Sequence, residues 1–336
     1  MTTPFPLLRL PRLALFPVFE QMEEREIIAF SLLSKRAHNL SKSLRKLSAT
    51  SIKLTVEKDS HHLTAYFKYR GAVGPLFYSN STAYQYLVFQ NETISREKVG
   101  LSVSEWIERI QDVTNCKSLK RVDLRGPPRL DICDALSSLK NISELYIHPG
   151  CPNSFAKKAL EILSPVTTEI NIWKIPFENR DEFSTFLMSN LNFLNFDSHG
   201  FSRFYFDSHG FSGFDLDDFL VTNALKVRLE EFVFFARVVS QFFTNWFHSK
   251  RKSRLEHLSL VTIGDINETC LPETLNAIPY PRDQERTFFY SKQLDTPSKT
   301  FSGGYDIERT DGKKATIVFV PPGDGGLTFF DFYVWP

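Results

Sequence analysis

This sequence contains few cysteines and methionines, and its net charge is close to zero. Its 336 residues include 4 Cys and 3 Met, and 40 Lys and Arg are balanced by 39 Asp and Glu. No cysteine forms a CxxC pair or stands at a zinc-ligand spacing from a histidine, so we expect neither a structural metal site nor a disulfide scaffold. We expect reduced, partly buried thiols in an intracellular protein that is cytoplasmic, nuclear or both. The net charge of +1 also argues against a general nucleic-acid binder, which needs a basic excess.

Long apolar runs are missing as well. Four prolines and two arginines interrupt the first twenty residues, so no secretory signal is expected there. Residues 229–252 are the other apolar stretch, but Arg237, Gln241 and Asn245 leave it short of the ~18 apolar residues that a membrane span needs. We interpret 229–252 as a Phe-rich amphipathic helix and expect no membrane partner. The basic residues 250–254 fit the end of that helix, and the alternative is a nuclear localisation patch.

Catalytic motifs are absent too. There is no HExxH, GxSxG or P-loop, and no GxGxxG follows a strand pattern. We interpret the glycine-rich segment 323–327 as a turn between strands, because no helix pattern follows it to receive a phosphate. His61 and His62 lie in a predicted strand and are expected to face solvent. The sequence therefore predicts a protein that is not an enzyme, with no catalytic residues and no cofactor.

Phenylalanine, in contrast, is abundant at 32 residues and predicts an aromatic interior. Residues 51–91 alternate between apolar and polar side chains and predict a small antiparallel sheet, and residues 102–113 predict a helix. The alternation returns in 285–336, where we expect C-terminal β hairpins. Asp311 and Gly312 separate two of these segments and predict a hairpin with a primed turn.

A short phrase of the form L-x-x-L-x-L recurs between these two regions. It occurs, with substitutions, at 119–124, 142–147, 167–172, 191–196 and 255–260, and three helix-like segments lie between the first four occurrences. A strand plus a helix every ~20–29 residues is typical of leucine-rich repeats, although the Asn that normally follows the strand is missing. We predict irregular repeat-like strand–helix units over 102–264 whose strands share one core. The alternative is an ordinary α/β domain with strands at similar intervals.

An insertion, predicted at 197–228, separates the last two phrases. The heptapeptide FDSHGFS begins at Phe196 and again at Phe206. Its Asp and His residues could be metal ligands, namely Asp197, His199, Asp207 and His209. A glycine makes each copy turn-like, however, so we favour a local duplication in an exposed loop and predict no metal site.

The first 48 residues carry the most specific signal. FPLLRLP at 5–11 precedes an apolar helix, and EII at 26–28 and SLLSKR at 31–36 follow it. This order and spacing closely resemble an F-box. The chain is similar to a large family, expanded in nematodes, that joins the F-box to a type 2 F-box-associated domain, and its segments 303–307 and 311–317 are similar to that family's closing hairpin. The resemblance implies a three-helix F-box at 1–48 and an F-box-associated domain at 49–336, with an α+β or α/β fold overall.

The resemblance also implies an adaptor role. F-box proteins bind a small SKP-type adaptor, which recruits a cullin scaffold carrying a RING subunit and a ubiquitin-conjugating enzyme, and they hold a protein substrate close by. The residues assigned to adaptor binding begin with the family's Leu-Pro signature and supply apolar surface to the module and its partner face: Leu10, Pro11, Leu13, Phe16, Phe19, Ile28 and Leu32. The competing interpretation is a repeat-type interaction scaffold that is not coupled to ubiquitination.

Two positions depart from the family pattern. Residues 12–14 (RLA) follow the Leu-Pro pair where many F-boxes have an acidic residue. Pro17 falls inside the predicted first helix, where its missing N–H and its ring are expected to kink the helix at a cost of ~3 kcal/mol. After it, the pattern predicts a helix with an acidic opening turn and a basic end at Lys35 and Arg36.

Overall fold

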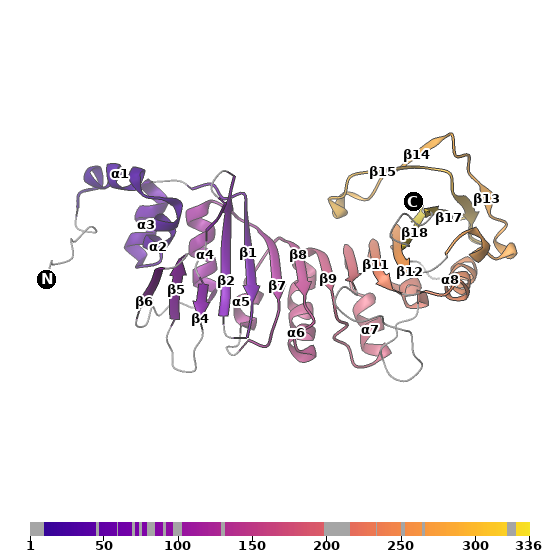
Figure 1. Cartoon of the computed structure of the whole chain (residues 1–336), viewed down its shortest axis with the longest axis horizontal. Helices are drawn as coiled ribbons and strands as arrows, with labels where there is room; N and C mark the ends of the chain where they lie inside the picture. Colours follow the sequence, from indigo (N-terminus) through magenta and orange to yellow (C-terminus); the bar gives the residue numbers. More distant parts are fainter. Residues whose placement is uncertain are drawn as a thin grey trace. The chain divides into compact units, whose positions relative to one another are not determined.

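The computed structural model of the chain (Figure 1) has two compact units, Met1–Thr167 and Thr168–Pro336. The residues that the structure describes are 10–44, 47–58, 60–68, 71–73, 76–78, 85–89, 92–96, 103–128, 132–197, 216–232, 234–249, 253–263, 266–320 and 327–336. Nearly all of the duplicated FDSHGFS segment, the basic residues 250–252 and the glycines of 323–326 lie outside these ranges. Within them, no helix is both long and apolar enough to cross a bilayer.

The first unit opens with three short helices, α1 (Arg12–Gln21), α2 (Glu24–Ser31) and α3 (Lys35–Leu44). The predicted three-helix module is therefore confirmed. Pro11 precedes α1 with a φ of −59°, which is close to the helical value and suits a helix start. A reciprocal capping box between Glu23 and Glu26 begins α2.

The expected single helix after Met22 is in fact two helices. The Oγ of Ser34 accepts a hydrogen bond from the Ala37 N–H at 3.1 Å and so caps the start of α3. Lys35 and Arg36 consequently open α3 instead of closing α2, and the dipole argument for them was wrong. Both side chains are exposed, so water screens their unfavourable position at a helix N-terminus.

A mixed sheet forms the rest of the first unit. Its strands are β1 (Ser51–Val56), β2 (Ser60–Phe67), β3 (Gly71–Val73), β4 (Leu76–Tyr78), β5 (Gln85–Phe89), β6 (Glu92–Arg96), β7 (Leu119–Leu124) and β8 (Ile142–Ile147). They lie in the order β8-β7-β1-β2-β4-β5-β6, with β3 also paired to β2. The predicted antiparallel sheet is present, and it continues into parallel strands because β1 pairs in parallel with β7.

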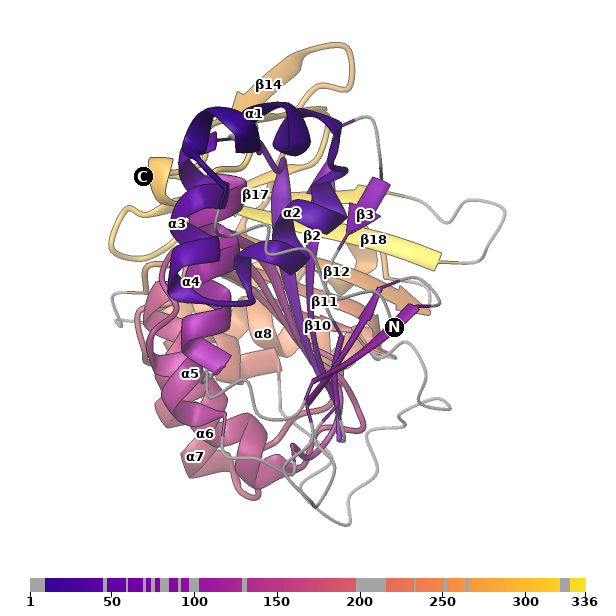
Figure 2. The same cartoon turned by 90° about the vertical axis from the view of Figure 1, so that its left-hand side faces the viewer.

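Helices cover one face of this sheet. These are α4 (Val103–Thr114), α5 (Cys133–Ser137) and α6 (Asn153–Leu163), followed by the short 3-10 helix η2 (Ser164–Val166), and α4 to α6 lie along the same side of the strands in Figure 2. His61 lies on the helix-covered face, because it stands opposite Val56 and two residues before Leu63 on β2. It is only 3% exposed, so the expectation that it faces solvent was wrong, and burial lowers its pKa.

The second unit also contains both parallel and antiparallel strands. Its strands are β9 (Thr167–Ile172), β10 (Phe193–Asp197), β11 (Lys226–Phe232), β12 (His257–Ile263), β13 (Ile278–Pro279), β16 (Tyr305–Glu308), β17 (Lys314–Val320) and β18 (Leu327–Val334), and a separate hairpin is made of β14 (Glu285–Phe288) and β15 (Lys299–Ser302). The order is β9-β10-β11-β12-β18-β17-β16-β13. Its helices are α7 (Arg180–Leu187) and α8 (Ala236–His248), with 3-10 turns η3 (Leu216–Val221), η4 (Glu268–Cys270), η5 (Glu273–Leu275) and η6 (Lys292–Leu294).

All five recurring phrases form strands. Within the first unit Val122 pairs with Leu145, and within the second unit Ile170 pairs with Leu194, each pair in parallel strands and fully buried. Regular strand–helix succession is thus observed in both units. Assignment of these units to leucine-rich repeats stays a prediction.

The interpretation of 229–252 as one helix was wrong at its start. Residues up to Phe232 belong to β11, which lies between β10 and β12 and is parallel to both. The helix α8 begins only at Ala236. The first residues of this strand, 226–228, therefore lie inside the region that was predicted to be an insertion.

Aromatic side chains fill the core of the second unit on both faces of β18. Phe332 packs against Phe242 and Trp246 of α8, with ring centroids 5.8 and 5.2 Å apart. On the opposite face, Tyr333 stacks on Phe301 of the β14–β15 hairpin at 4.6 Å. The abundance of phenylalanine is explained by this packing. The four cysteines are all buried, and none of them forms a disulfide.

Candidate functional site

The seven residues assigned to adaptor binding divide into an accessible group and a buried group. The accessible group, on α1 or just before it, is Leu10, Pro11, Leu13 and Phe16. The buried group is Phe19, Ile28 and Leu32. Only the accessible side chains are placed to contact another protein directly, whereas the buried ones pack inside the three-helix module.

The exposed side of α1 is unusually apolar. Leu13 is 87% exposed and Phe16 is 44% exposed, and the spacing of three residues places them on the same side of the helix. Pro17 is exposed beside them. We call Leu13, Phe16 and Pro17 the α1 face. Because a helix on a soluble domain normally turns such residues inward, a continuous apolar face in water is typical of a docking surface.

The opposite side of α1 holds the helix in place. Leu15 and Phe19 are its buried residues, and Phe19 makes an edge-to-face contact with Phe30 of α2, with ring centroids 5.2 Å apart. Because α1 is anchored by its buried side, the residues on its exposed side can contact a partner protein while the helix stays attached to the module.

Pro17 does not end α1, which continues from Arg12 to Gln21. The hydrogen bond that Pro17 cannot donate would have gone to the carbonyl of Leu13. Since Leu13 is highly exposed, water can hydrate that carbonyl. This hydration, together with the position of the proline ring on the outer side, lowers the expected cost of a proline inside the helix.

The module is mounted on the rest of the first unit through α4. The Lys42 Nζ lies 3.0 Å from the Asp112 Oδ2, and the His38 Nε2 lies 3.6 Å from the same oxygen. Beyond α3, the Ala49 N–H donates to the Thr114 carbonyl at 3.1 Å. Polar contacts of α3 and of the following linker therefore converge on the last turn of one helix, which orients the α1 face relative to the sheet of the same unit.

A buried carboxylate, which the sequence interpretation missed, organises the open face of that sheet. The Asp123 side chain on β7 is fully buried and lies 2.6 Å from the Lys53 Nζ, 2.7 Å from the Arg121 Nε, 3.5 Å from the Arg125 Nη2 and 3.6 Å from the His148 Nε2. Burial alone would raise the Asp123 pKa, but the hydrogen bonds from these groups outweigh it and hold the pKa well below its usual range. The cluster ties together β1, β7 and the segment after β8.

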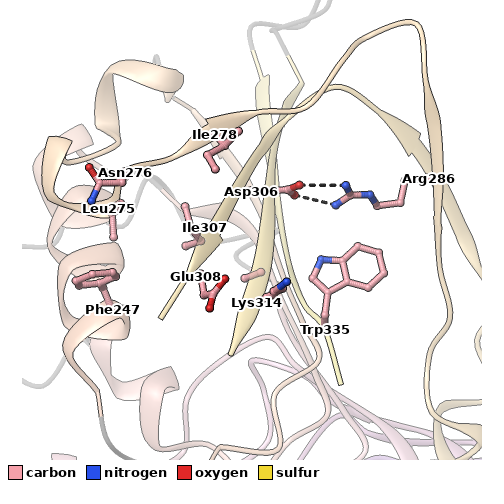
Figure 3. A pocket seen from close by; sticks show the side chains of 11 residues that line it. Phe247, Leu275, Asn276, Ile278, Arg286, Asp306, Ile307, Glu308, Lys314 and Trp335 are labelled. Carbon is pink, nitrogen blue, oxygen red and sulfur yellow. Dashed lines mark hydrogen bonds and ion pairs between the residues drawn. The ribbon is translucent and has the colours of Figure 1, made fainter. Parts of the chain in front are cut away.

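The second unit contains a pocket of about 760 Å³ at the edge of its sheet, which Figure 3 shows from close by. We call it the edge pocket. It is lined by residues of α8, η5, β13, β14, β16, β17 and the chain end: Phe247, Leu275, Asn276, Ile278, Arg286, Asp306, Ile307, Glu308, Lys314, Ala315 and Trp335. Its size lies within the range of ligand sites.

The two sides of the edge pocket differ in chemistry. In Figure 3 the strand carrying Asp306 to Glu308 runs through the middle, with Phe247 and Leu275 on one side and Arg286 and Trp335 on the other. The first side, which Ile307 joins, is apolar, and we call it the apolar wall. The second side carries charges, and we call it the polar wall.

The polar wall is held rigid by one network. The Arg286 guanidinium makes two hydrogen bonds to the Asp306 carboxylate, at 2.8 and 3.0 Å. The Thr316 Oγ1 donates to Asp306 at 2.6 Å and accepts from the Trp335 Nε1 at 2.9 Å. Arg286 also lies over the Tyr280 ring, with its Cζ 3.9 Å from the centroid. Sequence patterns could not have predicted this site, since its residues come from segments far apart in the chain.

Two family models match the chain. The model of the F-box domain matches residues 7–48, which include α1, α2 and α3, and a model described as F-box associated matches residues 182–260, which run from α7 to β12. Searches of curated proteins and of solved structures give no significant match.

The three-helix module and a part of the mixed α/β structure that follows it thus match two domain families whose members are adaptor-type proteins. The N-terminal residues of the chain match an F-box domain, and a segment of its second unit matches a type 2 F-box-associated domain. The combination is that of a substrate adaptor for ubiquitin ligases of the SCF type.

Proposed function

We propose that this protein is the substrate-recognition adaptor of an SCF-type cullin-RING ubiquitin ligase, acting in the cytoplasm, the nucleus or both. The F-box at 1–48 docks to an SKP-type adaptor, and the F-box-associated domain at 49–336 captures a protein substrate. The chain supplies no chemistry. It accelerates ubiquitin transfer by raising the local concentration of the substrate near the conjugating enzyme.

The α1 face is the observation that supports docking of the F-box to an SKP-type adaptor. Leu10, Pro11, Leu13 and Phe16 make the direct contacts in this proposal, because they are accessible. Phe19, Ile28 and Leu32 act from inside the module by keeping α1 in position. The contacts of α3 with Asp112 favour the same role, since a substrate must be presented at a defined orientation to the conjugating enzyme.

The test is binding of the full chain to a purified SKP-type adaptor by isothermal titration calorimetry. Replacing Leu10 and Pro11 together by Ala, or replacing Leu13 by Asp, should weaken binding at least about thirtyfold, since loss of a central interface anchor costs ~2 kcal/mol or more. Thermal stability should stay nearly unchanged, since the substituted side chains are accessible. The matched control is Val18→Ala, which alters an exposed apolar residue of α1 that lies off the α1 face.

Two results would contradict the proposal in different ways. If the Leu10 and Pro11 variant still binds the adaptor normally, then the docking surface lies elsewhere on the chain. If the unmodified chain binds neither the adaptor nor, in cells, the cullin, then the ligase assignment fails and the uncoupled interaction scaffold replaces it.

A further inference from the structure

The edge pocket exposes backbone as well as side chains. The sheet ends at β13, which is only two residues long and pairs Ile278 with Asp306 and Pro279 with Tyr305. The neighbouring strand β16 continues for two more residues, Ile307 and Glu308. The edge of β16 beyond Asp306 is therefore not covered by β13.

Hydrogen bonds at the hairpin show which backbone groups face that edge. The Arg309 N–H donates to the Lys313 carbonyl at 2.8 Å, so Arg309 points its backbone groups toward β17. Because these groups alternate along an antiparallel strand, those of Glu308 and Asp306 point the other way, toward β13. In agreement, the Gly304 carbonyl accepts from the Tyr280 N–H at 2.8 Å. Asp306 thus meets β13, and the N–H and carbonyl of Glu308 open into the pocket.

The chain's own backbone turns away where it would otherwise cover Glu308. If β13 continued in register, Asn276 would stand opposite Glu308. Asn276 instead has a φ of 46°, in the left-handed region, and its N–H bonds back to the Glu273 carbonyl at 3.1 Å. A residue in the left-handed region cannot continue the extended backbone of a strand. The described part of the chain thus leaves one strand position at the sheet edge unpaired, with side-chain walls on both sides of it.

We propose that the edge pocket binds a short extended peptide that adds to β16, with its central residue paired to the backbone of Glu308. The side chains next to that residue point to the opposite face of the sheet, against the apolar wall of Phe247, Leu275 and Ile307, and are therefore apolar. We infer that this peptide is a segment of a ubiquitination substrate, and this inference rests on the proposed function above.

The charges of the pocket exclude a phosphate as the main determinant of binding. Two of its lining side chains are basic and two are acidic. One basic group, Arg286, already makes two hydrogen bonds to Asp306 and one to the Thr316 Oγ1. Lys314 stands directly across the strand pair from Glu308. Phosphopeptide sites instead gather several arginines without compensating carboxylates. The segment recognised is accordingly an unphosphorylated one.

The proposal is tested with a displayed library of random twelve-residue peptides, selected on the full chain. An enriched peptide is then synthesised, and its affinity is measured by fluorescence anisotropy. Glu308→Pro removes the outward N–H, with which no strand among the described residues pairs. Proline is tolerated in that position on an edge strand. It should weaken binding about tenfold or more. The matched control Glu308→Ala keeps the N–H and should stay within about threefold.

Two further measurements identify the binding mode. Methylation of single backbone nitrogens along the peptide should abolish binding at one position and be tolerated at its two neighbours, because an edge pair uses every second residue. Phe247→Ala should also weaken binding about tenfold, through the apolar wall. Thermal melting of each variant establishes that it is folded.

The proposal is overturned by any of four outcomes: no peptide is enriched; Glu308→Pro binds as the unmodified chain does; only phosphorylated peptides bind; or the unmodified chain forms dimers that Glu308→Pro dissociates, which makes a second copy the occupant. Adaptor binding is measured on the same samples and should not change in Glu308→Pro. A chain that binds the peptide but no SKP-type adaptor would refute the proposed function and leave the peptide site standing.

Discussion

Replacing Asp123 by Asn should destabilise the first unit strongly, although the two side chains have nearly the same shape. Lys53 and Arg121 each approach the carboxylate to within 2.7 Å. With an effective dielectric constant of about 20, each contact corresponds to ~6 kcal/mol of attraction. Removing the carboxylate from water offsets several kcal/mol of that sum, and both cations are partly exposed, which weakens it further. Loss of the central charge leaves the cations repelling one another, so we expect a net loss of ~3–5 kcal/mol.

The assay is hydrogen exchange of β1 and β7, followed by mass spectrometry, because it reports the opening of this sheet alone. The control is Arg125→Ala, which removes a half-exposed member of the same cluster and should cost less than ~1 kcal/mol. If exchange of β7 in Asp123→Asn stays within 1 kcal/mol of the unmodified chain, then the cluster is a surface feature and the reasoning from burial is wrong.

The same carboxylate predicts a dependence on pH. The folded pKa of Asp123 lies below its value in an unfolded chain, so its contribution is complete above the unfolded pKa and is lost as the pH falls below it. The stability difference between the unmodified chain and Asp123→Asn should therefore be constant from about pH 7 to 5 and shrink below about pH 4. A difference that grows on acidification would contradict this sign.

Two further predictions concern the second unit. Phe332→Ala should lower its stability by ~3–5 kcal/mol in urea denaturation, because the fully buried ring packs on α8. Phe329→Ala, which alters an exposed side chain of the same strand, should cost far less. Equal losses would show that α8 is not essential to the core. The pKa of His257 is lowered mainly by burial, against the raising effect of Asp331, so its contribution is present above about pH 6.5 and is lost as the pH falls. His257→Gln should consequently flatten the decrease in melting temperature from pH 7.5 to 5.5, and identical slopes in the two proteins would refute the assignment.

Elements whose signal is local were predictable from the sequence. Pro11 precedes α1, the phrases at 119–124 and 142–147 form β7 and β8, and the hairpin around Asp311 and Gly312 joins β16 to β17. The hairpin also shows the limit of such a signal. Gly312 has a φ of 86°, but Asp311 has no positive φ, and the Arg309 carbonyl accepts from the Gly312 N–H. The connection is thus a turn with a glycine bulge instead of the predicted primed turn.

The missed strand β11 has a different cause. Residues 232–236 (FVFFA) are all apolar, so a helical and an extended period fit them equally well. The neighbouring strands determine whether this segment becomes a strand or a helix. Val227 stands between Leu194 and Leu258 in parallel register, and this pairing stabilises the strand as far as Phe232. The helix can start only after the strand has left the sheet, at Ala236.

At His61, too, the pairing of the strands overrides the local sequence pattern. Its polarity predicted exposure, but the register with Val56 places it on the helix-covered face. Since the strand cannot turn one residue outward without exposing Leu63 as well, the apolar majority determines the orientation. The cost is a histidine whose pKa is lowered by burial, and no local pattern could have reported it.

Adaptor docking could be predicted from the sequence, whereas peptide binding in the edge pocket could not, and one physical reason explains the difference. Docking through the α1 face uses residues within two turns of a single helix, so its signal survives in a short motif. The edge pocket uses Asn276, Arg286, Glu308 and Trp335, which come together only when β13, β14, β16 and the chain end have folded. Its decisive features are a left-handed φ at Asn276 and a backbone N–H at Glu308 that faces outward, and neither depends on a characteristic side chain. An adaptor whose recognition site is made of backbone at a sheet edge can change its substrate preference through a few wall residues, while the docking motif stays recognisable.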